Sequence, residues 1–271
     1  MLIKELSFEG SKNDDITALL VPSSSSNPSA GILFLHWGFG DRTSFVREAE
    51  MYAATGATSL LIDAPGFGSR KGPRIPTKNA PAAFAFCEQL VGDLQRALEY
   101  LSAQPGVDTG RLAFVGHSLG ASIGGAFLKT VPEMKAAALM AGTGMLSHVW
   151  LTSAVADAAQ LVEPFDGIRC LPQVRTSLLL QFAKHDEFIS KTDADAQIAA
   201  APDPRAVDWQ DCDHAFDANA LQTRYNWLSD QLDLDDNVSF KGNQTLPNSQ
   251  IWRYKIAKFI LRVTNRSSAS K

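Results

Sequence analysis

The stretch Ala113-Phe-Val-Gly-His-Ser-Leu-Gly-Ala-Ser122 decides the fold of this 271-residue chain. It begins as an apolar strand, turns at two glycines with fixed spacing, and continues as a helix of small residues. The pattern Gly116-x-Ser118-x-Gly120 suits a sharp strand-to-helix turn in which the serine takes a strained backbone conformation. Glycine is needed two residues before and after the serine because larger side chains would collide there. The pattern therefore predicts a nucleophilic Ser118 hydroxyl at a helix N-terminus, where backbone N–H groups face a developing oxyanion.

Around this turn, continuous apolar runs alternate with helical patterns. The runs are typical of strands buried on both faces, and the clearest of them occupy residues 31–36, 58–63, 111–116, 135–141, 176–182 and 205–211. Such alternation predicts an α/β fold with a doubly wound, mostly parallel sheet of about eight strands and helices on both faces. We expect a single domain over residues 1–271, with a short cap or excursion over the site at about 142–175 and an extra C-terminal helix at about 250–264.

The C-terminal helix is amphipathic and basic. Its apolar face consists of Trp252, Ile256, Phe259, Ile260 and Val263, with Arg253, Lys258 and Arg262 lying off that face. Helices of this kind bind membranes, but more often the apolar face packs on its own domain and the charges are solvated. We expect the packed arrangement here.

Composition excludes several classes of function. The net charge of −4 gives no global attraction to nucleic acid or to an anionic membrane, and no apolar run is long enough to span a bilayer. The N-terminus lacks a secretory pattern, and the widely spaced Cys87, Cys170 and Cys212 suit reduced thiols in the cytoplasm. They lack metal-ligand spacing, and Gly66-x-Gly68 indicates a turn rather than a dinucleotide loop. We expect no metal and no cofactor.

A serine nucleophile needs a base, and the base needs a carboxylate that holds its tautomer. Among five histidines, His214 alone follows the last predicted strand, on the same sheet edge as Ser118. Asp186 follows the preceding strand at that edge, with Glu187 as the neighbouring alternative. Asp213 is too close to His214 in sequence to orient it easily. The predicted triad is therefore Ser118, Asp186 and His214, in the chain order of the α/β-hydrolases.

These motifs together make the chain resemble the α/β-hydrolase superfamily over roughly residues 31–232, most closely its dienelactone hydrolase-like and small esterase branches. The resemblance implies a three-layer α/β-hydrolase fold. Two departures count against dienelactone chemistry and favour a general esterase. The nucleophile is Ser118 where the dienelactone branch often has cysteine, and Trp37 replaces the glutamate that this branch places after the third strand.

The same resemblance implies an oxyanion hole. The residue after the nucleophile, Leu119, supplies one N–H, and the loop at residues 36–40 supplies the second. Gly38 is the preferred donor by its position after the strand, with Trp37 and Phe39 as alternatives. Trp37, Phe39 and Trp150 are candidates for lining an acyl pocket, and ordinary core packing explains them equally well.

The favoured function is hydrolysis of carboxylic esters or thioesters of small molecules through an acyl-Ser118 intermediate. The same triad also suits a carbon–carbon bond hydrolase or a small peptidase, and hydrolase-fold proteins without chemistry act as binding proteins. The sequence specifies neither the natural substrate nor the oligomeric state, because substrate choice depends on the shape of the cap.

Overall fold

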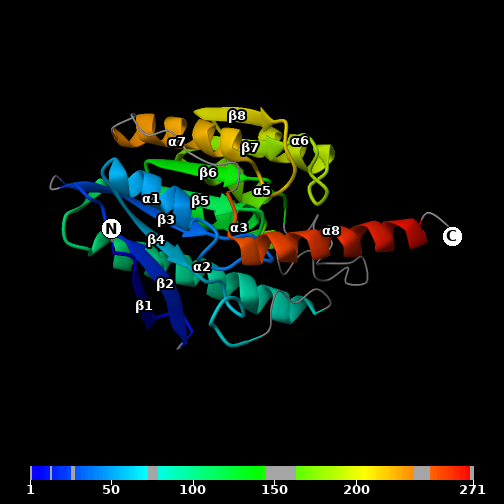
Figure 1. Ribbon diagram of the computed structural model, residues 1–271, viewed down its shortest axis with the longest axis horizontal. Coiled ribbons are helices and arrows are strands. Elements are labelled where there is room, and N and C mark those ends of the chain that lie inside the picture. The colour runs from blue at the N-terminus through cyan, green and yellow to red at the C-terminus, as the bar shows by residue number, and fades with distance from the viewer. Residues whose placement is uncertain are drawn as a thin grey trace.

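The structure is a computed structural model that describes residues 2–12, 14–25, 28–72, 79–144, 163–234 and 245–268. Its strands form one sheet in the order β1-β2-β4-β3-β5-β6-β7-β8 (Figure 1). Their bounds are β1 Lys4–Glu9, β2 Asp15–Val21, β3 Ser29–Leu35, β4 Ala57–Ile62, β5 Val107–His117, β6 Ala136–Met140, β7 Ser177–Ala183 and β8 Arg205–Gln210. The predicted α/β fold with an eight-stranded sheet is confirmed.

The strand directions place the functional loops together. β1, β2 and β4 pair antiparallel in turn, whereas β4, β3, β5, β6, β7 and β8 run parallel. Every residue of β3, β4 and β6 is buried, as expected for strands covered on both faces. Because the carboxyl ends of parallel strands meet at one edge, the loops after β3, β5, β7 and β8 converge there.

Helices cover both faces of the sheet. Their bounds are α1 Val46–Ala54, α2 Ala80–Ser102, α3 Leu119–Leu128, α5 Gly167–Cys170, α6 Lys191–Ala200, α7 Ala218–Leu232 and α8 Asn248–Ser268, with 3-10 turns η1 Glu163–Phe165 and η2 Leu171–Gln173. One hydrophobic cluster joins α2 and α3 to one face, and a second joins α1 and α7 to the other. β5 serves both, since Phe114 points into the first cluster while Ala113 and Val115 point into the second. The three layers are therefore helix, sheet and helix.

The predicted excursion at 142–175 is described only in part. From Glu163 to Gln173 the chain forms η1, α5 and η2, and α5 packs closely against α3. A Cβ on Gly125 would lie 2.3 Å from the carbonyl oxygen of Gly167, so the two backbones approach without side chains between them. Residues 145–162, which include Trp150, lie outside the described residues. A cover over the site stays a prediction.

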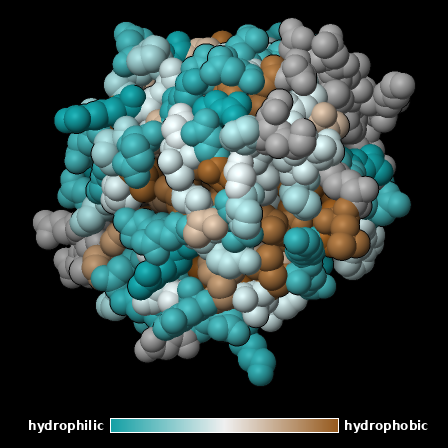
Figure 2. Space-filling view, turned by 90° about the vertical axis from the view of Figure 1, so that its left-hand side faces the viewer, coloured by the Kyte–Doolittle hydropathy of each residue, from teal (hydrophilic) through white to brown (hydrophobic). Residues whose placement is uncertain are grey.

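The C-terminal helix differs from the prediction in extent and orientation. α8 begins at Asn248 and ends at Ser268, against the predicted 250–264. It lies beside the edge to which the parallel strands point and extends past the sheet (Figure 1). The opposite end of the molecule, seen in Figure 2, is mostly hydrophilic with scattered apolar residues. The expectation that Trp252 and Phe259 pack on the domain is wrong, because both side chains are exposed. The side of α8 that faces the body carries Gln250, Tyr254 and Ala257 instead.

Candidate active site

The turn between β5 and α3 holds Ser118 in a strained conformation. Its backbone angles are φ 52° and ψ −97°, a region that costs a residue with a side chain about 1–3 kcal/mol. A Cβ on Gly116 would lie 2.5 Å from the carbonyl carbon of Gly120, and one on Gly120 would lie 2.4 Å from the Leu35 carbonyl oxygen. The Ser118 N–H donates to the Met140 carbonyl at 2.8 Å, which ties the turn to β6. The glycine spacing in the sequence thus has a steric cause.

Asp186 and His214 form a buried pair at the same sheet edge. The His214 Nδ1 lies 2.8 and 3.0 Å from the two Asp186 carboxylate oxygens, and both side chains are almost inaccessible. Asp186 Oδ1 also accepts the N–H groups of Phe188 and Ile189 at 2.8 and 2.9 Å, so the loop after β7 wraps around the carboxylate. An ionised carboxylate only accepts hydrogen bonds, hence Nδ1 carries the proton and Nε2 keeps its lone pair.

The two other acids that the sequence places near His214 are engaged elsewhere. Glu187 accepts a hydrogen bond from the Tyr254 hydroxyl at 2.9 Å and forms an ion pair with Lys258. Asp213 pairs with Lys258 at 3.2 Å. Asp186 is therefore the carboxylate that holds His214.

His117 connects the serine turn to the loop of His214, a contact that the sequence did not reveal. Its Nε2–H donates to the His214 carbonyl oxygen at 2.9 Å, and the two rings lie 4.9 Å apart. Burial, reinforced by the neighbouring His214, holds the pKa of His117 well below its usual value, so the ring is neutral. The residue that precedes Ser118 thus contacts the loop of His214 directly. A histidine inside the turn was the only sequence signal for this contact.

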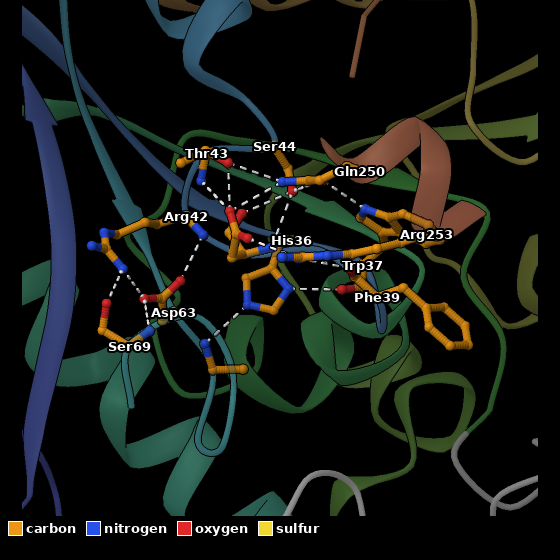
Figure 3. Close-up of polar contacts among 12 residues, drawn as sticks. His36, Trp37, Phe39, Arg42, Thr43, Ser44, Asp63, Ser69, Gln250 and Arg253 are labelled. Atoms are coloured by element: carbon orange, nitrogen blue, oxygen red, sulfur yellow. Dashed lines mark hydrogen bonds and ion pairs between the residues drawn. The ribbon is translucent and has the colours of Figure 1, made fainter. Parts of the chain in front are cut away.

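His36 braces the loop after β3 (Figure 3). The His36 Nδ1–H donates to the Trp37 carbonyl at 2.7 Å, and Nε2 accepts the Ala64 N–H at 3.1 Å. Burial lowers the pKa of His36, which keeps the ring in this neutral tautomer. The Gly40 N–H also donates to the Trp37 carbonyl, at 2.9 Å, and closes the turn.

The residues named for the oxyanion hole lie at the start of α3 and in the loop after β3. Leu119 is the first residue of α3, where backbone N–H groups have no partner within the helix. In the described part of the chain, neither its N–H nor that of Gly38 has a hydrogen-bond acceptor. Trp37 is fully buried and packs edge-on against the Tyr254 ring. The centroid of its indole lies 6.1 Å from the centroid of the His117 imidazole, so the Trp37 side chain belongs to an aromatic cluster. Phe39 is 40% exposed and lies against Trp37.

Asp63, at the end of β4, anchors the same loop from below (Figure 3). Its carboxylate accepts the Arg42 N–H at 2.7 Å, the Arg42 guanidinium at 2.5 Å and the Thr17 hydroxyl at 2.6 Å. Gly68, with φ +56°, passes so close that a Cβ there would lie 2.1 Å from this carboxylate. Asp63 therefore joins the loops after β3 and β4 to the antiparallel strand β2.

Gln250 of α8 is the second residue that sequence reasoning missed. It is fully buried, and its side-chain amide contacts four residues of the loop after β3 (Figure 3), namely Trp37, Asp41, Thr43 and Ser44. No sequence pattern signals a glutamine that bonds across more than 200 positions. Within the described residues, no group of three metal-ligating side chains gathers, and no helix is long and apolar enough to cross a membrane.

Comparisons with known proteins agree with this architecture. An uncharacterized protein of Mycobacterium tuberculosis strain H37Rv is 26% identical over 191 residues, a match that covers 68% of this chain and 62% of that protein. The chain thus spans less than two thirds of the length of this relative.

Solved structures with the same fold include enzymes of different specificity. An acetyl xylan esterase from Paenibacillus sp. R4 superposes with a TM-score of 0.72 at 17% identity, over 84% of this chain and 83% of its own. The esterase domain of a Rhodothermus marinus protein has a TM-score of 0.63 at 20% identity, over 85% and 97%. A puromycin-hydrolyzing peptidase of Mycobacterium tuberculosis has a TM-score of 0.66 at 16% identity, over 89% and 41%. At such identities the likeness establishes the fold alone.

The model of one protein family, described as the alpha/beta hydrolase family, matches residues 32–248. The match begins in β3 and ends where α8 begins, so it includes the serine turn and the loops of Asp186 and His214. This chain belongs to the alpha/beta hydrolase family.

Proposed function

We propose that the chain hydrolyses carboxylic esters of small molecules through an acyl-Ser118 intermediate, with His214 as the base and Asp186 as the acid that orients it. The observation that carries the proposal is the buried Asp186–His214 pair, whose histidine loop contacts the residue preceding the strained Ser118. A binding protein has no need of both a strained serine after a strand and a buried histidine–carboxylate pair.

In the proposed acylation, His214 Nε2 takes the proton of the Ser118 hydroxyl while the oxygen attacks the ester carbonyl carbon. The negative charge on the carbonyl oxygen is stabilised by the Leu119 N–H and by an N–H of the loop after β3, for which Gly38 is the preferred donor. Collapse of the tetrahedral intermediate breaks the bond to the leaving alcohol, which takes the proton from His214.

Deacylation repeats these steps with water. His214 removes a proton from the water molecule, the hydroxide attacks the acyl carbon, and the serine oxygen leaves with the proton from His214. Asp186 keeps its negative charge throughout and stabilises the imidazolium that forms twice per cycle. The products are the free acid and the alcohol, and the proposed steps use no cofactor.

The esterases among the structural neighbours support esters as the substrate class of this chain. Because one of these neighbours is an acetyl xylan esterase, esters of short acyl groups are the first substrates to test. A peptidase with the same fold keeps amide hydrolysis as the second candidate. The choice between them depends on how the leaving group binds.

The test measures hydrolysis of p-nitrophenyl acetate and butyrate, with matched p-nitroanilides for the amide alternative. Ser118→Ala should reduce kcat by on the order of 10³-fold or more while the circular dichroism spectrum stays unchanged. A fluorophosphonate should label Ser118, and peptide mass spectrometry should find Ser122, four residues on, unlabelled. Turnover that survives in Ser118→Ala, or a wild-type protein with neither turnover nor labelling, would contradict the proposal.

A further inference from the structure

The helix α8 presents one side to the body and the other to solvent. Gln250, Tyr254 and Ala257 recur at intervals of four and three residues, so they share one side of the helix, and all three are buried. On the same side Tyr254 bonds to Glu187, and Gln250 bonds to the loop after β3. These contacts fix which way the helix is turned.

The opposite side is apolar and exposed. Trp252, Ile256, Phe259 and Ile260 follow at intervals of four, three and one residues, and their exposed fractions are 66%, 37%, 68% and 54%. We call these four residues the outer face of α8. The described part of the chain exposes seven large hydrophobic residues, and four of them belong to this one face. Single exposed apolar residues are ordinary, whereas a contiguous group of large ones marks an interaction surface.

The charge of α8 is the reverse of that of the whole chain. The helix sequence contains Arg253, Lys255, Lys258, Arg262 and Arg266 and no acidic residue, although the net charge of the chain is −4. Arg253 pairs with Asp41, and Lys258 pairs with Glu187 and Asp213, so these two cations are neutralised by the body.

Lys255 lies on the solvent side. It stands three residues after Trp252 and four before Phe259, so it borders the outer face. It is exposed and has no ion-pair partner among the residues that the structure describes. The outer face therefore combines large apolar side chains with a cation that the body leaves available.

We propose that the outer face of α8 docks onto an anionic lipid surface. Helices that lie in the membrane interface combine exposed Trp, Phe and Ile with Lys and Arg and carry little or no acid. Apolar side chains enter the headgroup region, while basic side chains attract the lipid phosphates. The net negative charge of the chain does not oppose this, because ions screen charges about 10 Å away at 0.1 M salt and the helix itself is basic.

A second copy of the chain fits this surface less well. A symmetric dimer through the outer face of α8 would bring Lys255 near its counterpart at the border of the contact, and like charges oppose such an approach. α8 also extends past the sheet at the side of the molecule (Figure 1). Its outer face lies on the side of the helix opposite the buried Gln250, Tyr254 and Ala257.

Docking would bring the candidate site close to the lipid. Arg253 of α8 also contacts the Phe39 carbonyl at 3.4 Å, and Tyr254 holds Glu187, the residue next to Asp186. The helix therefore joins the outer face to the loops after β3 and β7. The docking itself does not rest on the proposed ester hydrolysis, and it is tested without any activity measurement.

The experiment is flotation of the full chain with vesicles of phosphatidylcholine alone or with 40 mol% phosphatidylglycerol. The wild-type protein should float with the anionic vesicles, less so at 0.5 M NaCl, and stay behind with the neutral ones. Trp252→Ala with Phe259→Ala should weaken binding by about tenfold or more, as expected from the apolar area lost. Lys255→Glu should also weaken it.

The matched control is Val207→Ala, which removes an exposed apolar side chain from β8, away from α8. This variant should bind as the wild type does, and circular dichroism and thermal unfolding should show all variants folded. The proposal is overturned if the wild type does not float with anionic vesicles at low salt. It is also overturned if the double variant floats as well as the wild type, or if sedimentation shows the outer face buried in a dimer that the double variant loses.

Discussion

The indole Nε1–H of Trp37 donates a hydrogen bond to the side-chain oxygen of Gln250 at 3.0 Å, across 213 positions of sequence. The same oxygen accepts the Ser44 hydroxyl at 2.7 Å, and the Gln250 amide nitrogen donates to Asp41 and Thr43 at 3.0 Å each. One buried amide thus joins the start of α8 to the loop that precedes α1. Every hydrogen-bonding position that this amide uses faces the loop proposed to hold part of the oxyanion hole.

We predict that Gln250→Ala lowers both stability and activity. The substitution leaves the buried Trp37 indole N–H without its acceptor, which costs about 1–3 kcal/mol, whereas the Ser44 hydroxyl keeps the Asp41 carbonyl at 2.8 Å. Urea unfolding should show a loss in this range, and kcat on p-nitrophenyl acetate should fall more than KM rises. Ser249→Ala, at the exposed neighbouring position, is the control and should change neither. An unfolding free energy of Gln250→Ala within about 0.5 kcal/mol of wild type would show that the Gln250 hydrogen bonds contribute little to stability.

We predict that Asp186→Asn reduces kcat by about 10⁴-fold, because an amide in place of the carboxylate favours the wrong histidine tautomer. Glu187→Gln is the matched control in the adjacent position. It retains a hydrogen-bond acceptor for Tyr254 and should keep activity within about tenfold of wild type, since Glu187 contacts α8 rather than His214. The two variants are compared in ester hydrolysis at the same pH. If Glu187→Gln proved the more damaging of the two, the assignment of Asp186 as the orienting acid would fail.

The sequence predicts local features of this fold well. The turn at Ser118 is specified by five consecutive residues. A parallel sheet brings the loops of Asp186 and His214 to the same edge, whatever the details of side-chain packing. The direct contact of His214 with Asp186 follows from that placement. Such features depend on chain neighbours and on sheet topology, both of which the hydrophobic pattern encodes.

Features that depend on distant partners were not predictable. The pattern of α8 identifies an apolar face but not what covers it, and the expectation that Trp252 and Phe259 face the domain was wrong. The helix is turned the other way because Gln250 and Tyr254 find polar partners in the loops after β3 and β7. The contact of His117 with the His214 carbonyl is equally invisible, since it joins two loops 97 positions apart.

We predict that stability falls as the pH drops below about 6.5, the usual pKa of histidine. Burial lowers the pKa of His117 and of His36 in the folded state, so the unfolded chain binds protons that the folded chain does not. Each group therefore contributes stability above its unfolded pKa that is lost as the pH falls toward its folded pKa. The loss is up to about 1.4 kcal/mol per pH unit for each histidine.

Urea unfolding between pH 7.5 and 5 measures this slope. His117→Phe should make it shallower, because one of the two buried groups is gone. His185→Asn replaces an exposed ring beside Asp211 and should leave the slope as it is in the wild type. If the pH dependence of the unfolding free energy is the same in His117→Phe as in the wild type, His117 does not take up a proton when the chain unfolds.

The last prediction concerns the ion pair between Glu48 of α1 and Arg224 of α7. The guanidinium lies 2.5 and 2.8 Å from the two carboxylate oxygens, and both side chains are buried. Arg224 also donates to the Gln181 side chain of β7 at 2.5 Å, so the pair connects two helices and a strand. Glu48→Ala leaves the guanidinium buried without its main counter-charge, which should cost about 3–5 kcal/mol in urea unfolding.

The matched control is Glu88→Ala, which breaks the ion pair with Lys12 on the surface. Water solvates both partners of that pair, so its loss should cost no more than about 1 kcal/mol. The contrast separates burial from charge, because each variant removes one carboxylate from one ion pair. Equal losses in the two variants would mean that the Arg224 guanidinium finds water or another acceptor when Glu48 is removed, and that α1 and α7 are held together by their apolar contacts instead.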